Sequence, residues 1–243
     1  MKVVICGANG RMGRELVKAV VADPDLVLLG GVVKKDDGEG QDLGDLASIS
    51  KTKVIAITDL TDIIADADLV IDFSMPKSSI SFASIAAKHK KPYLSGVTGY
   101  SEEQMAEIKA LGTQSAIFHS GNMSLGVNVL MKLAKIAAKY LPEYDIDLID
   151  VHHNKKIDAP SGTAKMILGA VKENSGQREV AVNSIRTGDF IGEHQIRFSG
   201  SLEALTISHQ AQSRSIFALG ALKVGKWLVK QQSGFYTMDD MLS

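Results

Sequence analysis

Residues 3–13 read VVICGANGRMG, and this stretch decides the first half of the fold. Val3–Cys6 is an apolar run typical of a buried strand, and a helical pattern runs from Arg11 to about Val21. Glycines between a strand and a helix permit a tight turn, and the amides at the helix start face an anion. The spacing is G-x-x-G-x-x-G rather than G-x-G-x-x-G, so an ordinary glycine turn is the alternative. We predict that a nucleotide is bound by Gly7, Ala8, Asn9, Gly10, Arg11 and Met12.

Short apolar runs alternate with helical patterns as far as residue 124. Helices are expected from Pro76 to about His89 and after Ser101, where Ser101 and Gln104 have the spacing of a capping box. Lys34–Asp45 is charged and has no apolar period, which indicates a loop. This alternation predicts a parallel sheet covered on both faces. Its further strands are expected at Leu26–Val33, Lys53–Ile57, Leu69–Phe73, Pro92–Ser95 and Ser115–His119.

The pattern changes after residue 124. A long amphipathic helix is expected to run to about Tyr140, followed by an alternating strand at Asp145–His153 and a helix from about Ser161. Ser213–Lys230 has the pattern of a last helix, which could return to the first domain. The second half therefore predicts an α+β domain with mixed or antiparallel pairing. Its other strand-like runs are Glu179–Arg186, Glu193–Phe198 and Leu202–Ser208.

Composition excludes several classes of protein. The 243 residues include 27 Lys and Arg against 28 Asp and Glu, which gives no indication of binding to nucleic acid or an anionic membrane. The single cysteine, Cys6, leaves no intrachain disulfide and no cysteine metal cluster, which favours a reducing compartment. The longest uncharged stretch, residues 110–131, is too polar to span a bilayer. We therefore expect a soluble, cytoplasmic protein.

The residues after the second expected strand bear on the choice of cofactor. An acid about 20 residues past the glycine loop would hold the ribose hydroxyls of NAD. Here Lys34 and Lys35 occupy that place, with Asp36 and Asp37 just beyond. Two cations favour a 2′-phosphate, so we predict a preference for NADPH, with NADH also accepted. A solvated charged loop is the alternative.

The stretch DVHHNKKIDAPSGTA, residues 150–164, predicts an anion site. Lys156 supplies a positive charge, and the amides of Gly162 and Thr163 lie at an expected helix start. His152 and His153 could exchange a proton near neutral pH. Two alternatives stay open on the segment alone. The histidines could be structural, or they could ligate a metal, although neighbouring histidines on a strand point to opposite faces.

The chain resembles the 4-hydroxy-tetrahydrodipicolinate reductase (dihydrodipicolinate reductase) family of the diaminopimelate–lysine pathway. The resemblance rests first on the run His-His…Lys-x-Asp-Ala-Pro-Ser-Gly-Thr-Ala and covers the whole chain. Residues 7–13 are similar to the family's cofactor loop. Residues 96–99 (GVTG) and 121–124 (GNMS) match two further cofactor-contacting turns, which would add Gly96, Val97, Thr98, Gly121, Asn122, Met123 and Ser124 to the cofactor site.

The resemblance implies a role for each matching residue of the His-His-Lys segment. It makes His152 the catalytic acid and Lys156 the catalytic lysine. It also implies contacts with the substrate carboxylates, which fall on His153, Ser161, Gly162 and Thr163. The implied reaction is NAD(P)H-dependent reduction of a cyclic imine dicarboxylate at ring carbon C4 after loss of water, with no metal.

The resemblance also implies the fold and the assembly. It indicates an α/β protein with a Rossmann-type domain of residues 1–124 and 214–243. An inserted α+β domain, residues 125–213, would bind the substrate and form a homotetramer. Two rival functions are another Rossmann oxidoreductase, such as an amino-acid dehydrogenase, and a non-catalytic nucleotide-binding module.

The chain departs from the family pattern at several places. Asp150 stands where many members have Glu, and Met75 stands where an arginine is frequent. Lys34 and Lys35 replace an acid followed by a base, and the segment between Lys172 and Arg186 is shorter than usual. The changes at residues 34, 35 and 75 affect cofactor preference, and the shortened segment affects loops of the inserted domain.

Overall fold

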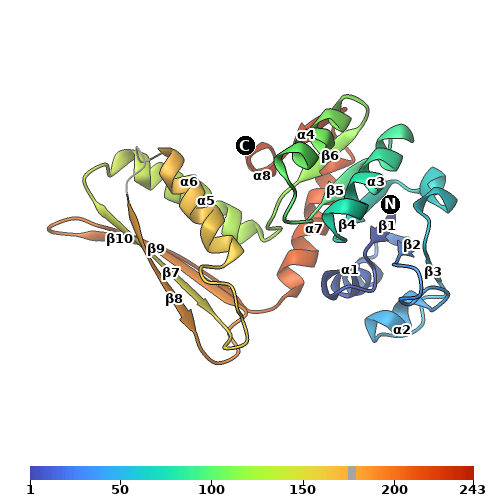
Figure 1. Cartoon of the computed structure of the whole chain (residues 1–243), viewed down its shortest axis with the longest axis horizontal. Helices are drawn as coiled ribbons and strands as arrows, with labels where there is room; N and C mark the ends of the chain where they lie inside the picture. Colours follow the sequence, from blue (N-terminus) through green and yellow to red (C-terminus); the bar gives the residue numbers. More distant parts are fainter. Residues whose placement is uncertain (175–178) are drawn as a thin grey trace. The chain divides into compact units, whose positions relative to one another are not determined.

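The computed structural model describes residues 1–174 and 179–243 (Figure 1). The chain divides into two compact units, each of which is described by itself. The first unit comprises Met1–Met123 and Ser215–Ser243, and the second comprises Ser124–Arg214. The expected fold class, a parallel Rossmann-type sheet with a separate α+β unit, is confirmed. Residues 175–178, part of the segment predicted to be short, lie outside the described residues.

The first unit is built on a seven-stranded sheet with the order β11-β6-β5-β4-β1-β2-β3. All of its strand pairs are parallel, so the carboxyl ends of the strands lie along one edge. Successive strands add outward in both directions from β1, and the order reverses between β1 and β4, which is where α/β sheets bind ligands. The strands are β1 (Lys2–Cys6), β2 (Val27–Val32), β3 (Ala56–Ile57), β4 (Leu69–Asp72), β5 (Tyr93–Ser95), β6 (Ala116–His119) and β11 (Gly234–Tyr236).

Helices cover both faces of this sheet (Figure 1). Val4 and Cys6 of β1 join a buried cluster on the face covered by α3 (Pro76–Lys88) and α4 (Glu102–Ala110). Side chains alternate along a strand, so Val3 and Ile5 point to the other face, where α1 (Arg11–Ala22) and α7 (Ser215–Leu228) pack together. Both faces of β1 are fully buried, which explains its continuous apolar sequence. The capping box of Ser101 and Gln104 is confirmed at the start of α4.

Several elements differ from the sequence expectation. The expected loop Lys34–Asp45 ends in a short helix, α2 (Leu43–Ala47), because the Asp42 carboxylate caps it by accepting from the amide of Gly44 at 2.7 Å. Hydrogen bonds from Thr52, Gly44 and Lys53 lower the pKa of Asp42 to about 2. The expected strand Lys53–Ile57 shortens to β3. Unexpected elements are β11, α8 (Met238–Met241) and the 3₁₀ turns Leu60–Asp62, Ile64–Asp66 and Leu111–Thr113.

The second unit is a four-stranded sheet with two helices on one face (Figure 1). The order is β10-β9-β7-β8, with β7 and β8 parallel and the other pairs antiparallel, so the sheet is mixed. Leu130 and Ile167 of the two helices pack on Leu148, Ile196 and Phe198 of the sheet. The elements are α5 (Leu125–Tyr140), β7 (Asp145–His152), α6 (Gly162–Asn174), β8 (Val180–Arg186), β9 (Gly192–Ser199) and β10 (Ala204–Ala211).

Two further observations bear on the class of protein. Within the described ranges, no helix combines the length and the apolar character needed to span a bilayer. Cys6 is a free cysteine, fully buried in β1. Burial raises the pKa of its thiol, and the nearby Asp72 adds to this effect, so the thiol stays protonated.

Two helical glycines test how closely the helices of the two units pack against their own neighbours. A Cβ at Gly220 in α7 would lie 1.9 Å from the carbonyl oxygen of Met123, whereas a Cβ at Gly169 in α6 would meet nothing within 4 Å. We expect Gly220→Ala to lower the free energy of unfolding by ~1–3 kcal/mol or more, because backbone must move. Gly169→Ala should raise it by roughly 0.5–1 kcal/mol. Urea denaturation measures both, and equal stability of Gly220→Ala and wild type would contradict the packing.

Candidate active site

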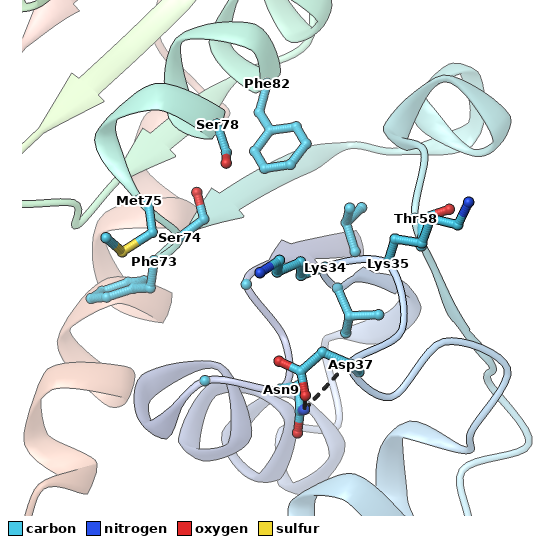
Figure 2. Close-up of a pocket in the computed structure, with 14 residues that line it drawn as sticks. Asn9, Lys34, Lys35, Asp37, Thr58, Phe73, Ser74, Met75, Ser78 and Phe82 are labelled. Atoms are coloured by element: carbon cyan, nitrogen blue, oxygen red, sulfur yellow. Dashed lines mark hydrogen bonds between the residues drawn. The ribbon is translucent and has the colours of Figure 1, made fainter.

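A cavity of about 490 Å³ opens at the carboxyl ends of β1, β2 and β4 (Figure 2). This volume falls in the range of small-molecule and cofactor sites. The structure brings five of the predicted cofactor residues to its wall, namely Gly7, Asn9, Gly10, Lys34 and Lys35. The other lining residues are Val32, Val33, Asp37, Thr58, Phe73, Ser74, Met75, Ser78 and Phe82. Of these, the sequence linked only Met75 to the cofactor, although Phe73, Ser74 and Met75 directly follow β4, where parallel topology places ligands.

Glycine is required at two positions where β1 turns into α1, one in the loop and one in the first turn of the helix. Gly7 has φ +76°, and a Cβ there would lie 3.0 Å from the backbone of Phe73 and Ser74. A Cβ at Gly13 would lie 2.1 Å from the carbonyl oxygen of Gly7, so only glycine lets α1 approach the loop this closely. The amides of Gly7 and Ala8 donate to the carbonyl of Val32, which fixes the loop against β2.

The start of α1 offers free amides to an anion. Gly10 is the N-cap residue without a side-chain cap, and the first turn contains no acidic residue. The first amide bonded within the helix is that of Arg14, which donates to Gly10, so the amides of Arg11 and Met12 precede the helical hydrogen bonds. These amides and the helix dipole favour a phosphate group at this end.

Lysines flank one side of the cavity. Figure 2 shows Lys34 and Lys35 with Thr58 on one side and Phe73, Ser74 and Met75 on the other. Both lysines are exposed, and within the described part of the chain neither ammonium group has an ion pair. The carboxylate of Asp37 accepts a hydrogen bond from Nδ2 of Asn9 at 2.8 Å, so the nearest lining acid is already engaged. The result is a local positive charge at the cavity wall.

The other two predicted cofactor turns lie at the same edge of the sheet but outside the lining of this cavity. Gly96, Val97 and Thr98 follow β5, and a Cβ at Gly96 would lie 2.3 Å from the ring of Phe73, which does line the cavity. Nε2 of His119 lies 3.0 Å from the carbonyl oxygen of Val97. The turn after β6 contains Gly121, Asn122 and Met123, whereas Ser124 belongs to the second unit and caps α5.

A buried carboxylate forms the centre of the second unit's candidate site. Asp150 of β7 is paired in register with His194 of β9, and its side chain is fully buried. Nδ1 of His152 lies 3.0 Å from Oδ1 of Asp150, and Nε2 of His194 lies 3.3 Å from the same oxygen. The His152 contact is an ion pair when the ring is protonated, and its angle is not that of a straight hydrogen bond. The sequence resemblance singled out His152, but the pairing with His194 needed the register of the strands.

Ser161 connects this carboxylate to the predicted anion site. Its amide donates to Oδ2 of Asp150 at 2.9 Å, and its hydroxyl donates to Oδ1 at 2.7 Å. The same hydroxyl accepts from the amide of Ala164 at 3.1 Å and so caps the start of α6. Gly162, the next residue, is exposed, and a Cβ there would meet nothing within 4 Å. The helix start is therefore open to a ligand.

The loop between β7 and α6 holds the other predicted residues. Nζ of Lys156 lies 2.7 Å from a carboxylate oxygen of Asp158, so these side chains form an ion pair. The amide of His153 donates to the carbonyl of Phe190 at 2.7 Å. Arg186 of β8 donates to Oδ2 of Asp150 at 3.0 Å and to the carbonyl of Asp158 at 2.6 Å. Arg186, which sequence reasoning did not assign, thus ties the loop to the buried carboxylate.

The metal site left open by the sequence would use His152 and His153, whereas the structure gathers His152 with Asp150 and His194. In the described ranges, Asp150, His152 and His194 bring ligand atoms within 4.8 Å of one another. However, Oδ1, the carboxylate oxygen that lies near both histidines, already accepts from the Ser161 hydroxyl, and Oδ2 accepts from the Arg186 guanidinium. The open helix start nearby suits an anion instead, so the contacts favour proton transfer beside a bound carboxylate.

Comparison with known families covers both units of the chain. The family model described as "Dihydrodipicolinate reductase, N-terminus" matches residues 1–123, and the model described as "Dihydrodipicolinate reductase, C-terminus" matches residues 126–242. The chain belongs to the dihydrodipicolinate reductase family. Family proteins named 4-hydroxy-tetrahydrodipicolinate reductase, from Burkholderia mallei and Burkholderia thailandensis, are each 39% identical over all of this chain and 98% of their own length.

Solved structures support the same family fold. A dipicolinate-bound dihydrodipicolinate reductase from Paenisporosarcina sp. TG-14 superposes with a TM-score of 0.85 at 24% identity, covering 98% of this chain and 97% of that one. An amine dehydrogenase from Mycobacterium smegmatis superposes with a TM-score of 0.73 at 12% identity, covering 98% and 95%. At these identities the likeness concerns the fold alone, and the dihydrodipicolinate reductase family assignment rests on the sequence matches.

Proposed function

We propose that this chain reduces 4-hydroxy-tetrahydrodipicolinate to tetrahydrodipicolinate with NAD(P)H. Its family consists of pyridine-nucleotide-dependent oxidoreductases of diaminopimelate and lysine biosynthesis whose substrate is a small dicarboxylate. One observation carries the proposal at the level of residues. The buried Asp150 contacts both the imidazole of His152 and Ser161, the residue that caps the start of α6. A proton donor and an anion-binding helix start are thereby held together.

The substrate carboxylates are assigned to Lys156, His153 and the helix start of Ser161, Gly162 and Thr163. The backbone amide of the exposed Gly162 is a donor for a carboxylate at that helix start, and α6 adds its dipole. The Lys156 ammonium now pairs with Asp158, so a bound carboxylate would share or replace that partner. Dipicolinate, the ligand named for the Paenisporosarcina relative, is also a dicarboxylate, which supports this class of substrate.

His152 is assigned as the general acid. When bound, NAD(P)H would supply the hydride that ring carbon C4 takes up after water has left the substrate. Nε2 of His152 gives the substrate ring the proton that balances this hydride, while Nδ1 faces the Asp150 carboxylate. Orientation of the ring by these contacts provides much of the rate advantage, since orientation is worth ~7–11 kcal/mol in favourable cases.

The cofactor is assigned to the cavity of the first unit, with a preference for NADPH. The glycine loop and the free amides of α1 suit the pyrophosphate. The exposed Lys34 and Lys35 suit the additional 2′-phosphate, while Asp37, which could otherwise accept from ribose hydroxyls, is bonded to Asn9.

We further propose a cytoplasmic homotetramer. Along α5, Val129, Leu133, Ile136 and Tyr140 follow a helical spacing and are 43–71% exposed. Such an apolar stripe on a surface helix is typical of an interface between proteins. The buried, unpaired Cys6 is in keeping with a reducing compartment.

Replacement of His152 tests the catalytic assignment. We expect His152→Gln to lower kcat by ~10²-fold or more, because the general acid is lost. A coupled steady-state assay with freshly generated substrate measures it, and His89→Gln, at the exposed end of α3, is the control. Wild-type turnover in His152→Gln would remove this residue from the role. Cofactor binding without any turnover in wild type would favour the non-catalytic module, and turnover with amino acids instead would favour the dehydrogenase.

Replacement of the two lysines tests the cofactor preference. Lys34→Ala/Lys35→Ala should raise the dissociation constant for NADPH by about tenfold, which corresponds to ~1.4 kcal/mol, and leave that for NADH nearly unchanged. Fluorescence titration measures both, with Lys88→Ala, at the far end of α3, as the control. Equal weakening of both cofactors would contradict an interaction with the 2′-phosphate.

Replacement within the α5 stripe tests the assembly. Light scattering should give a wild-type mass of about four times the 26.0 kDa chain. Leu133→Glu/Ile136→Glu should give smaller species, because buried charge opposes association. Lys165→Glu, exposed on α6, is the control. A monomeric wild type, or an unchanged mass for the double variant, would contradict this assignment.

A further inference from the structure

We propose that Asp150 is a positioning residue of this site, whose carboxylate orients the His152 imidazole and fixes the start of α6 at the same time. The inference rests on the proposed function, because it concerns how the proposed acid is held. Asp150 itself is fully buried, so it acts through its neighbours.

The two oxygens of the Asp150 carboxylate contact different groups. Oδ1 lies 3.0 Å from Nδ1 of His152, accepts from the Ser161 hydroxyl at 2.7 Å and lies 3.3 Å from Nε2 of His194. Oδ2 accepts from the Ser161 amide at 2.9 Å and from Arg186 at 3.0 Å. One rigid group therefore contacts the proton donor, the cap of α6 and the guanidinium that holds the intervening loop.

This arrangement selects which nitrogen of His152 exchanges a proton. In the described part of the chain, Nδ1 is buried without a hydrogen-bond partner of good geometry, and Asp150 is the acceptor within reach. A proton on Nδ1 is thus stabilised by the carboxylate, which leaves Nε2 for the substrate. Gly192 leaves room beside that atom, because a Cβ there would lie 3.0 Å from Nε2.

The carboxylate stays ionised where the proposed reaction takes place. Burial raises the pKa of Asp150, but its contacts with His152 and His194 and the hydrogen bonds from Ser161 outweigh burial and hold the pKa well below its ordinary value. Arg186 adds a positive charge at 3.0 Å. The group that Nδ1 of His152 faces is therefore an ionised carboxylate.

The packing around the carboxylate leaves it little freedom. His194 lies opposite Asp150 in the β7–β9 pairing, and its ring meets that of His152 edge to face at a centroid distance of 5.2 Å. Arg186 lies opposite His152 in the β7–β8 pairing. The neighbouring strands thus supply a partner on each side, so the position of the carboxylate is set by the sheet rather than by a loop.

Asp150→Asn is the main test. The amide removes the charge and half of the acceptor capacity, so we expect kcat to fall by about 10²-fold and KM to rise by a smaller factor. Asp147→Asn is the matched control, since it makes the same change on the same strand at a carboxylate that pairs with Arg197 at 3.1 Å near the surface. It should leave kcat unchanged.

A double variant separates positioning from a general structural role. If Asp150 acts through His152, His152→Gln/Asp150→Asn should have the same kcat as His152→Gln alone. Losses that multiply would overturn the proposal. Asp150→Glu keeps the buried charge opposite Arg186 and should recover part of kcat, which keeps the test valid if the Asn variant does not fold.

Histidine ¹⁵N NMR gives a readout independent of turnover. Wild-type protein should show His152 with its proton on Nδ1, assigned by the signal lost in His152→Gln, and Asp150→Asn should shift the population toward a proton on Nε2. An unchanged tautomer would overturn the proposal. Full turnover of His152→Gln would refute the proposed catalytic role instead, and the NMR result would still decide whether Asp150 orients the ring.

Discussion

The close approach of backbone to backbone after β1 is the constraint on which the first unit depends. Gly13 lets α1 begin within contact of the Gly7 carbonyl, and Gly7 lets the loop pass against residues 73 and 74 at the end of β4. Any side chain at either place would push α1 away from the sheet. The cavity, the free amides and the two lysines are positioned by this contact, because all of them border the same loop.

The second unit has a different constraint, because it must hold charged groups inside a small mixed sheet. An isolated buried carboxylate is costly, but Asp150 accepts hydrogen bonds from Ser161 and Arg186, and nitrogens of His152 and His194 lie 3.0 and 3.3 Å from its Oδ1. Two of these residues, His152 and Ser161, also belong to the proposed chemistry. In the second unit, the contacts that stabilise the fold therefore also position the proposed site residues. In the first unit, the lysines that face the ligand are exposed and contribute little to the stability of the fold.

Sequence patterns predicted those helices and strands that depend on interactions between residues close together in the sequence. The apolar run Val3–Cys6 and the capping box at Ser101 depend on neighbours in sequence, and both elements formed as expected. By contrast, β11 forms because it pairs with β6 at the edge of the sheet. The helix α2 forms because the Asp42 carboxylate accepts hydrogen bonds from the amides of residues 44, 52 and 53. The association of Asp150 with His194 and Arg186 likewise depends on strand register, which no spacing in the sequence encodes.

The last 29 residues return to the first unit, where α7 packs on the sheet and β11 forms its edge. The amino-terminal segment is thus synthesised long before the strand and helix that complete it. While the ribosome makes the second unit, one edge of the growing sheet lacks its partner and the face that α7 covers is open to solvent. The sheet of the first unit can therefore be completed only after the second unit has been synthesised.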